Sequence, residues 1–367
     1  EATVRSQERL SLPASRARRA LMIRAGHRLA PSPPSALLLS ACSLLHAASA
    51  FQAPPLSSSL LRRHAAPLRA GLRGGLRMTA LYDSHLHVWS DGAPPFPYAA
   101  GNEPPEELRK EATVEKLLAE MDEAGVQGCL VVQPINHKFD HSYVSACLSK
   151  HPTRLKGMCL LDPTGSADDA VAQLEALSKE GYVGVRFNPG LWPEGKKMDD
   201  DVGMAAYKKA GELGMAVGFM CFKGLDLHAP TIESLAAAHP GTKAIIDHFG
   251  FFRQDGKAKE EIWGMLLGLS KFPQVYVKLS AFFRVSGDPY PYQDLWARVR
   301  ELVQAFGSKR LLYGSDFPFV QQQCGYLKSS QALSVVRWGN EDSLLTEQEY
   351  RDVTAGTFES LFGALPG

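Results

Sequence analysis

Residues 113–133, TVEKLLAEMDEAGVQGCLVVQ, contain a helix pattern followed directly by a strand pattern. Apolar residues in the first half recur at the spacing of one helix face: Val114, Leu117, Leu118 and Met121. Gly125 ends this helix, because glycine readily adopts the left-handed conformation that closes a last turn. The run 128–133, which is apolar as far as Val132, has the length of a buried strand. This stretch therefore predicts one helix–strand step of an α/β fold.

The same alternation recurs from Leu81 onward. The predicted strands are Leu81–Val88, Gly128–Gln133, Leu155–Leu161, Val183–Asn188, Ala216–Phe222, Ala244–His248, Val275–Ser280 and Leu311–Ser315. The predicted helices are Thr113–Ala124, Asp168–Lys179, Gly203–Leu213, Pro230–Ala238, Lys259–Ser270 and Tyr292–Phe306, with two more near Tyr326–Trp338 and Thr346–Phe362. Strict alternation implies parallel strands joined by crossover helices, and eight such units predict a single-domain (β/α)8 TIM barrel over residues 80–367. A doubly wound open sheet is the alternative, but no glycine-rich phosphate loop follows the first strand.

Residues 1–79 have a different composition. The first 80 residues contain 12 arginines, no lysine and two glutamates, a formal charge of +10, whereas residues 81–367 contain 28 basic and 37 acidic residues, a charge of −9. An arginine-rich, serine-rich and acid-poor segment is typical of an organelle presequence, which we predict to be cleaved near Met78.

Within this presequence, residues 22–50 are signal-like and residues 51–79 are transit-like. The uncharged apolar run Ser35–Ala50 follows Arg24 and Arg28 and ends in a small-x-small cleavage pattern. Together the two segments resemble the bipartite presequences of algae with secondary plastids, and Met22 is a candidate start. We therefore predict a plastid location, with a mitochondrial or secreted protein as the alternative.

Composition excludes several other classes. A hydrophobic content of 45% excludes a disordered chain, and a net charge of +1 argues against a nucleic-acid partner. The five cysteines after the presequence form no CxxC pair, so neither a disulfide framework nor a cysteine zinc site is expected. The apolar run in the presequence is too short to span a bilayer comfortably, and no membrane segment is expected in the mature form.

Polar side chains collect at the carboxyl ends of the predicted strands, where TIM barrels carry their active sites. His85 and His87 end the first strand and share one face of it, His248 ends the sixth, and Asp316 ends the eighth, next to the first in a closed barrel. A carboxylate beside two histidines can bind a metal or act as a general base on water.

Two further residues are candidates for binding substrate, and a third is assigned to the fold. Arg186 lies in an apolar strand, where it either holds a substrate carboxylate or forms an internal salt bridge with a strand-end aspartate. His137, in the loop after the second strand, is a candidate substrate contact. Asp247 is expected to point away from His248 and to cap the following loop.

Three motifs in this order, DxHxH at 83–87, DHxG at 247–250 and GSDxP at 314–318, resemble the amidohydrolase-related branch of the amidohydrolase superfamily. The resemblance covers roughly residues 81–365. VKLS at 277–280 and NHKFDHSYV at 136–144 are most similar to the sugar lactonase and pyrone-dicarboxylate lactonase group. Metal-dependent decarboxylases of aromatic acids form the neighbouring group.

The resemblance implies a role for each matching residue. Asp316 would exchange protons with the hydrolytic water, His85, His87 and His248 would contact the reacting carbonyl, and Arg186 would hold a substrate oxygen or carboxylate. The implied activity is the hydrolysis of a lactone or similar cyclic ester of a small, anionic or sugar-derived molecule. The alternatives are a metal-dependent decarboxylase and a barrel that binds a metabolite without turnover.

A metal is the open question of this interpretation. His85, His87 and Asp316 could supply three ligands to one divalent ion, with zinc the first candidate. The fifth strand, however, has no histidine where metal-using members of the superfamily commonly supply one, and the pyrone lactonases, similar in this respect, are understood to work without metal. The sequence therefore leaves both one divalent ion and no cofactor open. It does not predict the oligomeric state.

Overall fold

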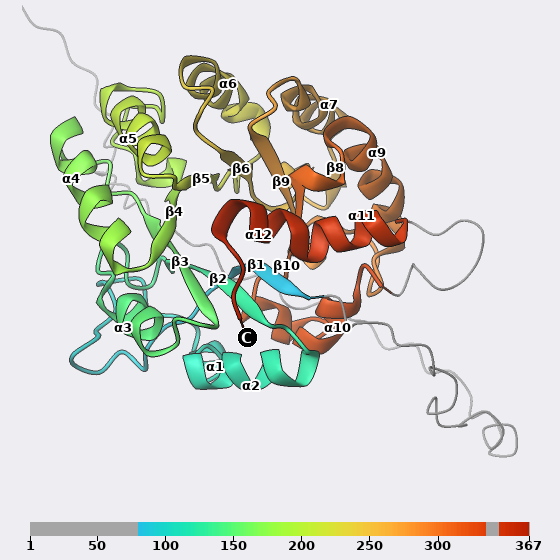
Figure 1. Cartoon of the computed structure of the whole chain (residues 1–367), viewed down its shortest axis with the longest axis horizontal. Helices are drawn as coiled ribbons and strands as arrows, with labels where there is room; N and C mark the ends of the chain where they lie inside the picture. Colours follow the sequence, from blue (N-terminus) through green and yellow to red (C-terminus); the bar gives the residue numbers. More distant parts are fainter. Residues whose placement is uncertain (1–79, 335–344, 367) are drawn as a thin grey trace, which may run out of the picture. The chain divides into compact units, whose positions relative to one another are not determined.

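The computed structural model describes residues 80–334 and 345–366 of the chain, and within them eight parallel strands form a barrel (Figure 1). The strands are β1 (Tyr82–Leu86), β2 (Gly128–Val132), β3 (Leu155–Leu160), β4 (Tyr182–Phe187), β5 (Ala216–Phe219), β6 (Ala244–Ile246), β9 (Val275–Ser280) and β10 (Leu311–Gly314). Each pairs with the next in this order, and a parallel bridge between Leu86 and Phe317 closes β10 onto β1. The predicted TIM barrel is confirmed. The predicted presequence lies outside the described residues, so its boundary stays a prediction.

Helices surround the barrel on its outside, and the last helix lies across one of its ends (Figure 1). They are α1 (Glu106–Arg109), α2 (Val114–Ala124), α3 (Ser142–Lys150), α4 (Ala167–Leu177), α5 (Asp201–Glu212), α6 (Ala229–Ala238), α7 (Glu260–Gly268), α8 (Phe282–Val285), α9 (Trp296–Phe306), α10 (Tyr326–Gln331), α11 (Glu347–Arg351) and α12 (Thr357–Phe362). A short antiparallel hairpin of β7 (Arg253–Gln254) and β8 (Lys257–Ala258), which the sequence pattern did not indicate, lies in the loop after β6. The helix predicted to reach Trp338 ends at Gln331, and its last predicted residues lie outside the described part.

Local sequence explains where the helices begin and end. The Thr113 side chain caps α2 by accepting from the Lys116 N–H at 3.2 Å, and Gly125 ends α2 in the left-handed conformation with φ of 70°. Ser166 and Asp169 form a reciprocal capping box at the start of α4. Gly125 is the signal that the sequence pattern uses for α2, whose bounds differ from the prediction by one residue, whereas the helix predicted over Thr346–Phe362 is divided into α11 and α12.

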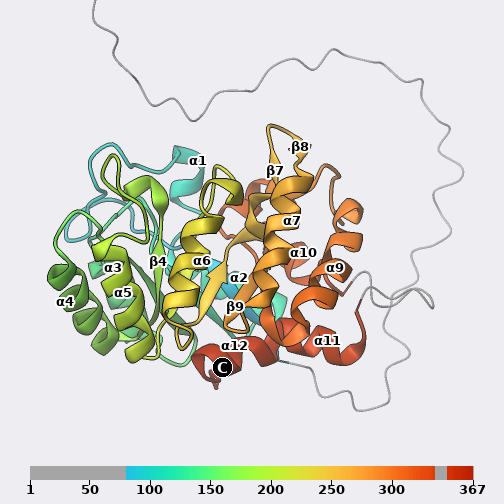
Figure 2. The ribbon, with the colours of Figure 1, turned by 90° about the horizontal axis from the view of Figure 1, so that it is seen from above.

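The amino-terminal end of the barrel is closed by the last helix, which lies at the opposite end from the β7–β8 hairpin (Figure 2). The ring of Phe358 in α12 stacks on Tyr82 of β1 with 4.6 Å between ring centroids. Phe358 and Phe362 belong to one apolar cluster with strand residues such as Leu130, Met158 and Ile245. Since α12 plugs this end, the open end for chemistry is the carboxyl-terminal one. Among the described residues, no helix is both long and apolar enough to cross a membrane.

Candidate active site

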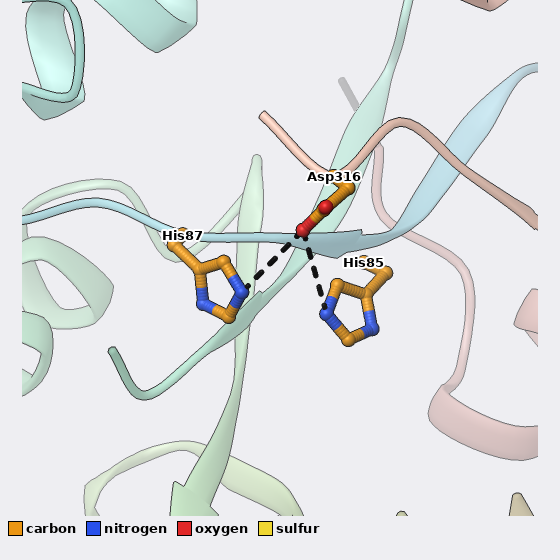
Figure 3. A group of neighbouring side chains, drawn as sticks. All are labelled: His85, His87 and Asp316. Carbon is orange, nitrogen blue, oxygen red and sulfur yellow. Dashed lines mark ion pairs between the residues drawn. The ribbon is translucent and has the colours of Figure 1, made fainter. Parts of the chain in front are cut away.

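The two histidines of β1 and the aspartate after β10 meet at the carboxyl-terminal end of the barrel. Asp316 Oδ1 lies 3.7 Å from His87 Nε2 and 4.0 Å from His85 Nε2, so both rings direct the same nitrogen toward one carboxylate oxygen (Figure 3). All three side chains are almost completely buried. The juxtaposition that the strand order predicted is therefore present.

A bulge in β1 directs His85 into the barrel. Tyr82 packs in the barrel interior, and the pairing of β1 with β2 shifts between Asp83 and Leu86, where three residues of β1 span only two of β2. The extra residue moves the inward face of the strand to His85. Strict alternation from Tyr82 would have directed Ser84 inward instead.

Asp83 connects the first strand, β1, to the segment that follows the last strand, β10. Its Oδ1 accepts hydrogen bonds from the backbone N–H groups of His85 and Ser315, both at 3.0 Å. The Asp316 N–H in turn donates to the His85 carbonyl at 2.8 Å. Asp83 thus sets the position of β1 against the segment that carries Asp316.

Among the described residues, the carboxylate of Asp316 has a side-chain hydrogen bond on one of its two oxygens, Oδ2. Arg284 of α8 donates from Nε to Asp316 Oδ2 at 2.6 Å, and its guanidinium lies over the ring of Phe319 at 4.7 Å. Burial raises the pKa of Asp316, and Arg284 opposes part of this rise. Asp316 has φ of 62°, a left-handed conformation that aspartate tolerates better than most residues.

Asp247 corrects the sequence interpretation, which assigned it to capping the next loop. It is fully buried among three groups: Lys278 Nζ lies 3.2 Å and His85 Nδ1 3.2 Å from its Oδ1, and Arg186 Nη2 lies 3.3 Å from its Oδ2. Burial raises the pKa of this carboxyl, but Lys278 and Arg186 outweigh burial and keep the pKa below its usual value. Asp247 is therefore an anion in the floor of the site.

Backbone geometry explains the error at Asp247. Ile245 faces the barrel interior, and Asp247, two residues later, continues that face. His248 reaches the site because its backbone turns into the left-handed region, with φ of 51°. The sequence pattern treated His248 as an ordinary strand residue and so assigned Asp247 to the opposite face.

His248 completes the histidine cluster. Its ring centroid lies 4.3 Å from that of His85 and 5.0 Å from that of Phe251, and its Nδ1 lies 2.8 Å from the Ser280 hydroxyl. Burial lowers the pKa of His85 and of His248 well below the usual value, and it lowers the pKa of His87 to about 3. The three imidazoles are therefore neutral at physiological pH and act through hydrogen bonds or as ligands rather than as cations.

The two predicted substrate contacts have different surroundings. Arg186 points into the cluster, where it forms the internal salt bridge with Asp247 that the sequence left as the alternative, and its Nη2 also lies 2.8 Å from Met220 Sδ. His137 donates from Nδ1 to the Pro97 carbonyl at 2.9 Å and accepts at Nε2 from the Ser90 N–H at 3.4 Å. With both ring nitrogens engaged in the loop after β1, His137 supports that loop, and its contact with substrate stays a prediction.

Sequence reasoning missed three residues of the site: Lys278 and Ser280 on β9, and Arg284 immediately after it. Lys278 had a usable signal, because a lysine inside an apolar strand is costly unless it is paired, the same argument that singled out Arg186. Arg284 had none, since it lies on a four-residue helix whose position only the fold reveals.

A metal ion could be held by His85, His87 and Asp316, whose ligand atoms all lie within 4.8 Å of one another. His87 suits this role, because its Nδ1 donates to the Val132 carbonyl at 2.8 Å and leaves a lone pair on Nε2. His85 does not suit it equally, because its Nδ1 lies 3.0 Å from the ammonium of Lys278. The donor set thus fits a metal in part: His87 and Asp316 can act as ligands, whereas His85 is less suited to this role.

An eight-stranded βα barrel whose strand ends bring together histidines and aspartates defines a class of TIM-barrel enzymes that act on small molecules. The sequence profile described as Amidohydrolase matches residues 82–363, and the chain belongs to this family. Members of the family commonly bind a divalent metal.

Curated relatives locate the chain in the lactonase branch of the superfamily and identify it as a lactonase-like hydrolase. The 4-sulfomuconolactone hydrolase of Rhizobium radiobacter is 27% identical over 241 residues, which cover 65% of this chain and 75% of the relative. The L-fucono-1,5-lactonase of Burkholderia ambifaria is 27% identical over 255 residues, 66% of this chain and 81% of the relative.

Solved structures share the fold. A probable 2-pyrone-4,6-dicarboxylic acid hydrolase from Acinetobacter baumannii superposes with a TM-score of 0.61 at 21% identity, over 77% of this chain and 99% of that one. An amidohydrolase from Burkholderia multivorans with bound zinc gives a TM-score of 0.58 at 18% identity, over 78% of this chain and 99% of that one.

Proposed function

We propose that this enzyme opens the ring of a small anionic lactone by hydrolysis. The observation that carries the proposal is the state of Asp316: one oxygen is fastened to Arg284, and the other faces the Nε2 atoms of His85 and His87. A buried carboxylate held in this way has a fixed orientation and one oxygen available for a water molecule. The lactone hydrolases among its relatives support the same reaction class.

In the proposed reaction, Asp316 Oδ1 takes a proton from water as the water oxygen attacks the lactone carbonyl carbon. Negative charge then develops on the carbonyl oxygen, where neutral imidazole N–H groups of the histidine cluster stabilise it. Collapse of this intermediate breaks the ring C–O bond, and protonated Asp316 returns its proton to the leaving alkoxide. The product is an open-chain hydroxy acid. The raised pKa of Asp316 makes the carboxylate a stronger base for the first step.

An anionic substrate fits the charge of the site. With the histidines neutral, the cluster contains three cations, Lys278, Arg186 and Arg284, against the two carboxylates Asp247 and Asp316. A substrate carboxylate or sulfonate would balance the remaining positive charge. A cavity of about 560 Å³ adjoins the cluster, and its lining includes Arg253, Arg284 and Asp255, together with Phe251, which contacts His248. The guanidinium of Arg284, which lines this cavity, can bind such an anion with two parallel hydrogen bonds.

A divalent ion, zinc first, remains part of the proposal as an alternative. His87 and Asp316 would hold it, together with His85 if His85 Nε2 carries a lone pair, and the ion would lower the pKa of its bound water. The steps described above involve only residues of this chain and need no metal.

The proposal is tested with a panel of carboxylated, sulfonated and sugar lactones, assayed with and without chelator. We expect turnover of an anionic lactone by the wild-type chain and about 1,000-fold lower kcat for Asp316→Asn, which keeps the size of the side chain but removes the base. Unchanged kcat in Asp316→Asn would contradict the role of Asp316. Release of CO₂ from an aromatic acid, lost on chelation, would instead support the decarboxylase alternative, and binding without turnover would support a metabolite-binding barrel.

A further inference from the structure

We propose that Lys278 is a positioning residue that keeps the proton of His85 on Nε2, so that His85 and His87 present opposite hydrogen-bonding groups to the reaction. This inference deepens the proposed lactone hydrolysis and rests on it for its catalytic consequence. Its structural part, the location of one proton, can be tested without any substrate.

The contact between Lys278 and His85 determines the direction of a hydrogen bond. Lys278 Nζ lies 3.0 Å from His85 Nδ1, and both side chains are fully buried. An ammonium group carries donors only, so Nδ1 of the neutral ring must accept. The ring proton is then on Nε2, the nitrogen that faces Asp316.

Asp247 reinforces this arrangement. Its Oδ1 lies 3.2 Å from both Lys278 Nζ and His85 Nδ1, but neither of its oxygens has a hydrogen-bond partner of good geometry among the described residues. We therefore treat Asp247 as the counter-ion of Lys278 rather than as the acceptor of a His85 Nδ1–H. Because an ammonium group cannot accept, the 3.0 Å contact between Lys278 Nζ and His85 Nδ1 is a hydrogen bond in the His85 tautomer that carries its proton on Nε2.

His87 has the opposite tautomer. Its Nδ1 lies 2.8 Å from the Val132 carbonyl, which can only accept, so the proton of His87 is on Nδ1 and Nε2 carries a lone pair. The two nitrogens facing Asp316 therefore differ: His85 offers a donor, and His87 offers an acceptor.

This difference suits the hydrolytic step. A water beside Asp316 can donate one hydrogen to Oδ1 and the other to His87 Nε2, which leaves an oxygen lone pair free for attack. The His85 Nε2–H is buried and has no partner among the described residues, which makes it a ready donor to the lactone carbonyl oxygen. The same proton prevents His85 Nε2 from binding a metal, so the cluster offers two ligand atoms rather than three while Lys278 is charged.

The direct test is ¹⁵N NMR of the full chain labelled with ¹⁵N-histidine, with His85→Asn used to assign the signals of His85. In the wild type we expect His85 to be protonated on Nε2 and His87 on Nδ1. In Lys278→Met, which has similar length but no charge, we expect the His85 proton to move to Nδ1 and donate to Asp247. We also expect kcat to fall about 100-fold with little change in KM, as for the loss of one oxyanion donor, and Lys278→Arg to retain the wild-type tautomer.

A wild-type His85 protonated on Nδ1 would overturn the inference, as would a Lys278→Met variant with unchanged tautomer and kcat. The wild-type spectrum decides the matter even if Lys278→Met fails to fold. Failure of the proposed function is a separate result: the wild type would turn over no lactone although His85 carries its proton on Nε2.

Discussion

At the scale of single residues, existing hydrogen bonds determine which atoms of the site remain available to water or substrate. Asp316 gives one oxygen to Arg284, and His87 gives one nitrogen to a backbone carbonyl, so each keeps one atom for chemistry. Arg186 is engaged with Asp247, which leaves Arg284, partly exposed beside a cavity, as the cation best placed to meet a substrate anion. The role assigned to Arg186 from the sequence is thus better suited to Arg284.

Replacing Arg284 tests whether this residue, rather than Arg186, binds the substrate anion. We expect Arg284→Met to lower kcat/KM about 10–100-fold more for an anionic lactone than for a neutral lactone of the same ring, because a charge-assisted hydrogen bond is worth about 1.5–3 kcal/mol. Steady-state kinetics with the two substrates provide the comparison, and the neutral lactone corrects for any shift of Asp316. An equal loss for both substrates would show that Arg284 acts only on Asp316.

At the scale of the elements, the catalytic side chains depend on irregular strand ends. The strands and most helices could be predicted from periodicity and caps, because these are local signals. The bulge in β1 and the left-handed turn at His248 could not, since neither leaves a mark in the local pattern of apolar and polar residues. The motifs at the strand ends were enough to identify His85, His248 and Asp316. They were not enough to predict the direction of the Asp247 side chain, which depends on the turn at His248.

The junction between β1 and β10 can be tested at Asp83. We expect Asp83→Ala to lower the free energy of unfolding by about 2–4 kcal/mol, because two buried backbone N–H groups lose the carboxylate oxygen that accepts from them. Denaturant titration measures the change. Asp83→Asn keeps an accepting oxygen and should lose clearly less, and the exposed Asp91→Ala, which breaks one local bond to Ala93, should stay within about 0.5 kcal/mol of wild type. Equal stability of all three variants would contradict the role of Asp83.

At the scale of the whole molecule, the barrel separates stability from chemistry. The plug of Phe358 and Phe362 occupies the amino-terminal end, and the charged cluster occupies the carboxyl-terminal end. Such a division could be predicted from the fold class alone. The pairing of cations with carboxylates in the floor of the site could not, because Arg186 lies on β4, Lys278 on β9 and Asp247 just after β6, and the barrel brings them together.

The different charge of the first 80 residues and of the rest of the chain leads to a prediction about the location of the protein. Residues 1–80 carry a charge of +10 and residues 81–367 a charge of −9, and we propose that the basic part is an address in two segments rather than part of the enzyme. A fluorescent protein fused behind residues 22–79 should enter the plastid of an alga with a secondary plastid. Fused behind residues 22–50 alone, it should enter the secretory route and stop there, because the apolar run directs the first crossing and the basic segment the second. Fluorescence in mitochondria with the longer fusion, or in the plastid with the shorter one, would contradict the bipartite assignment.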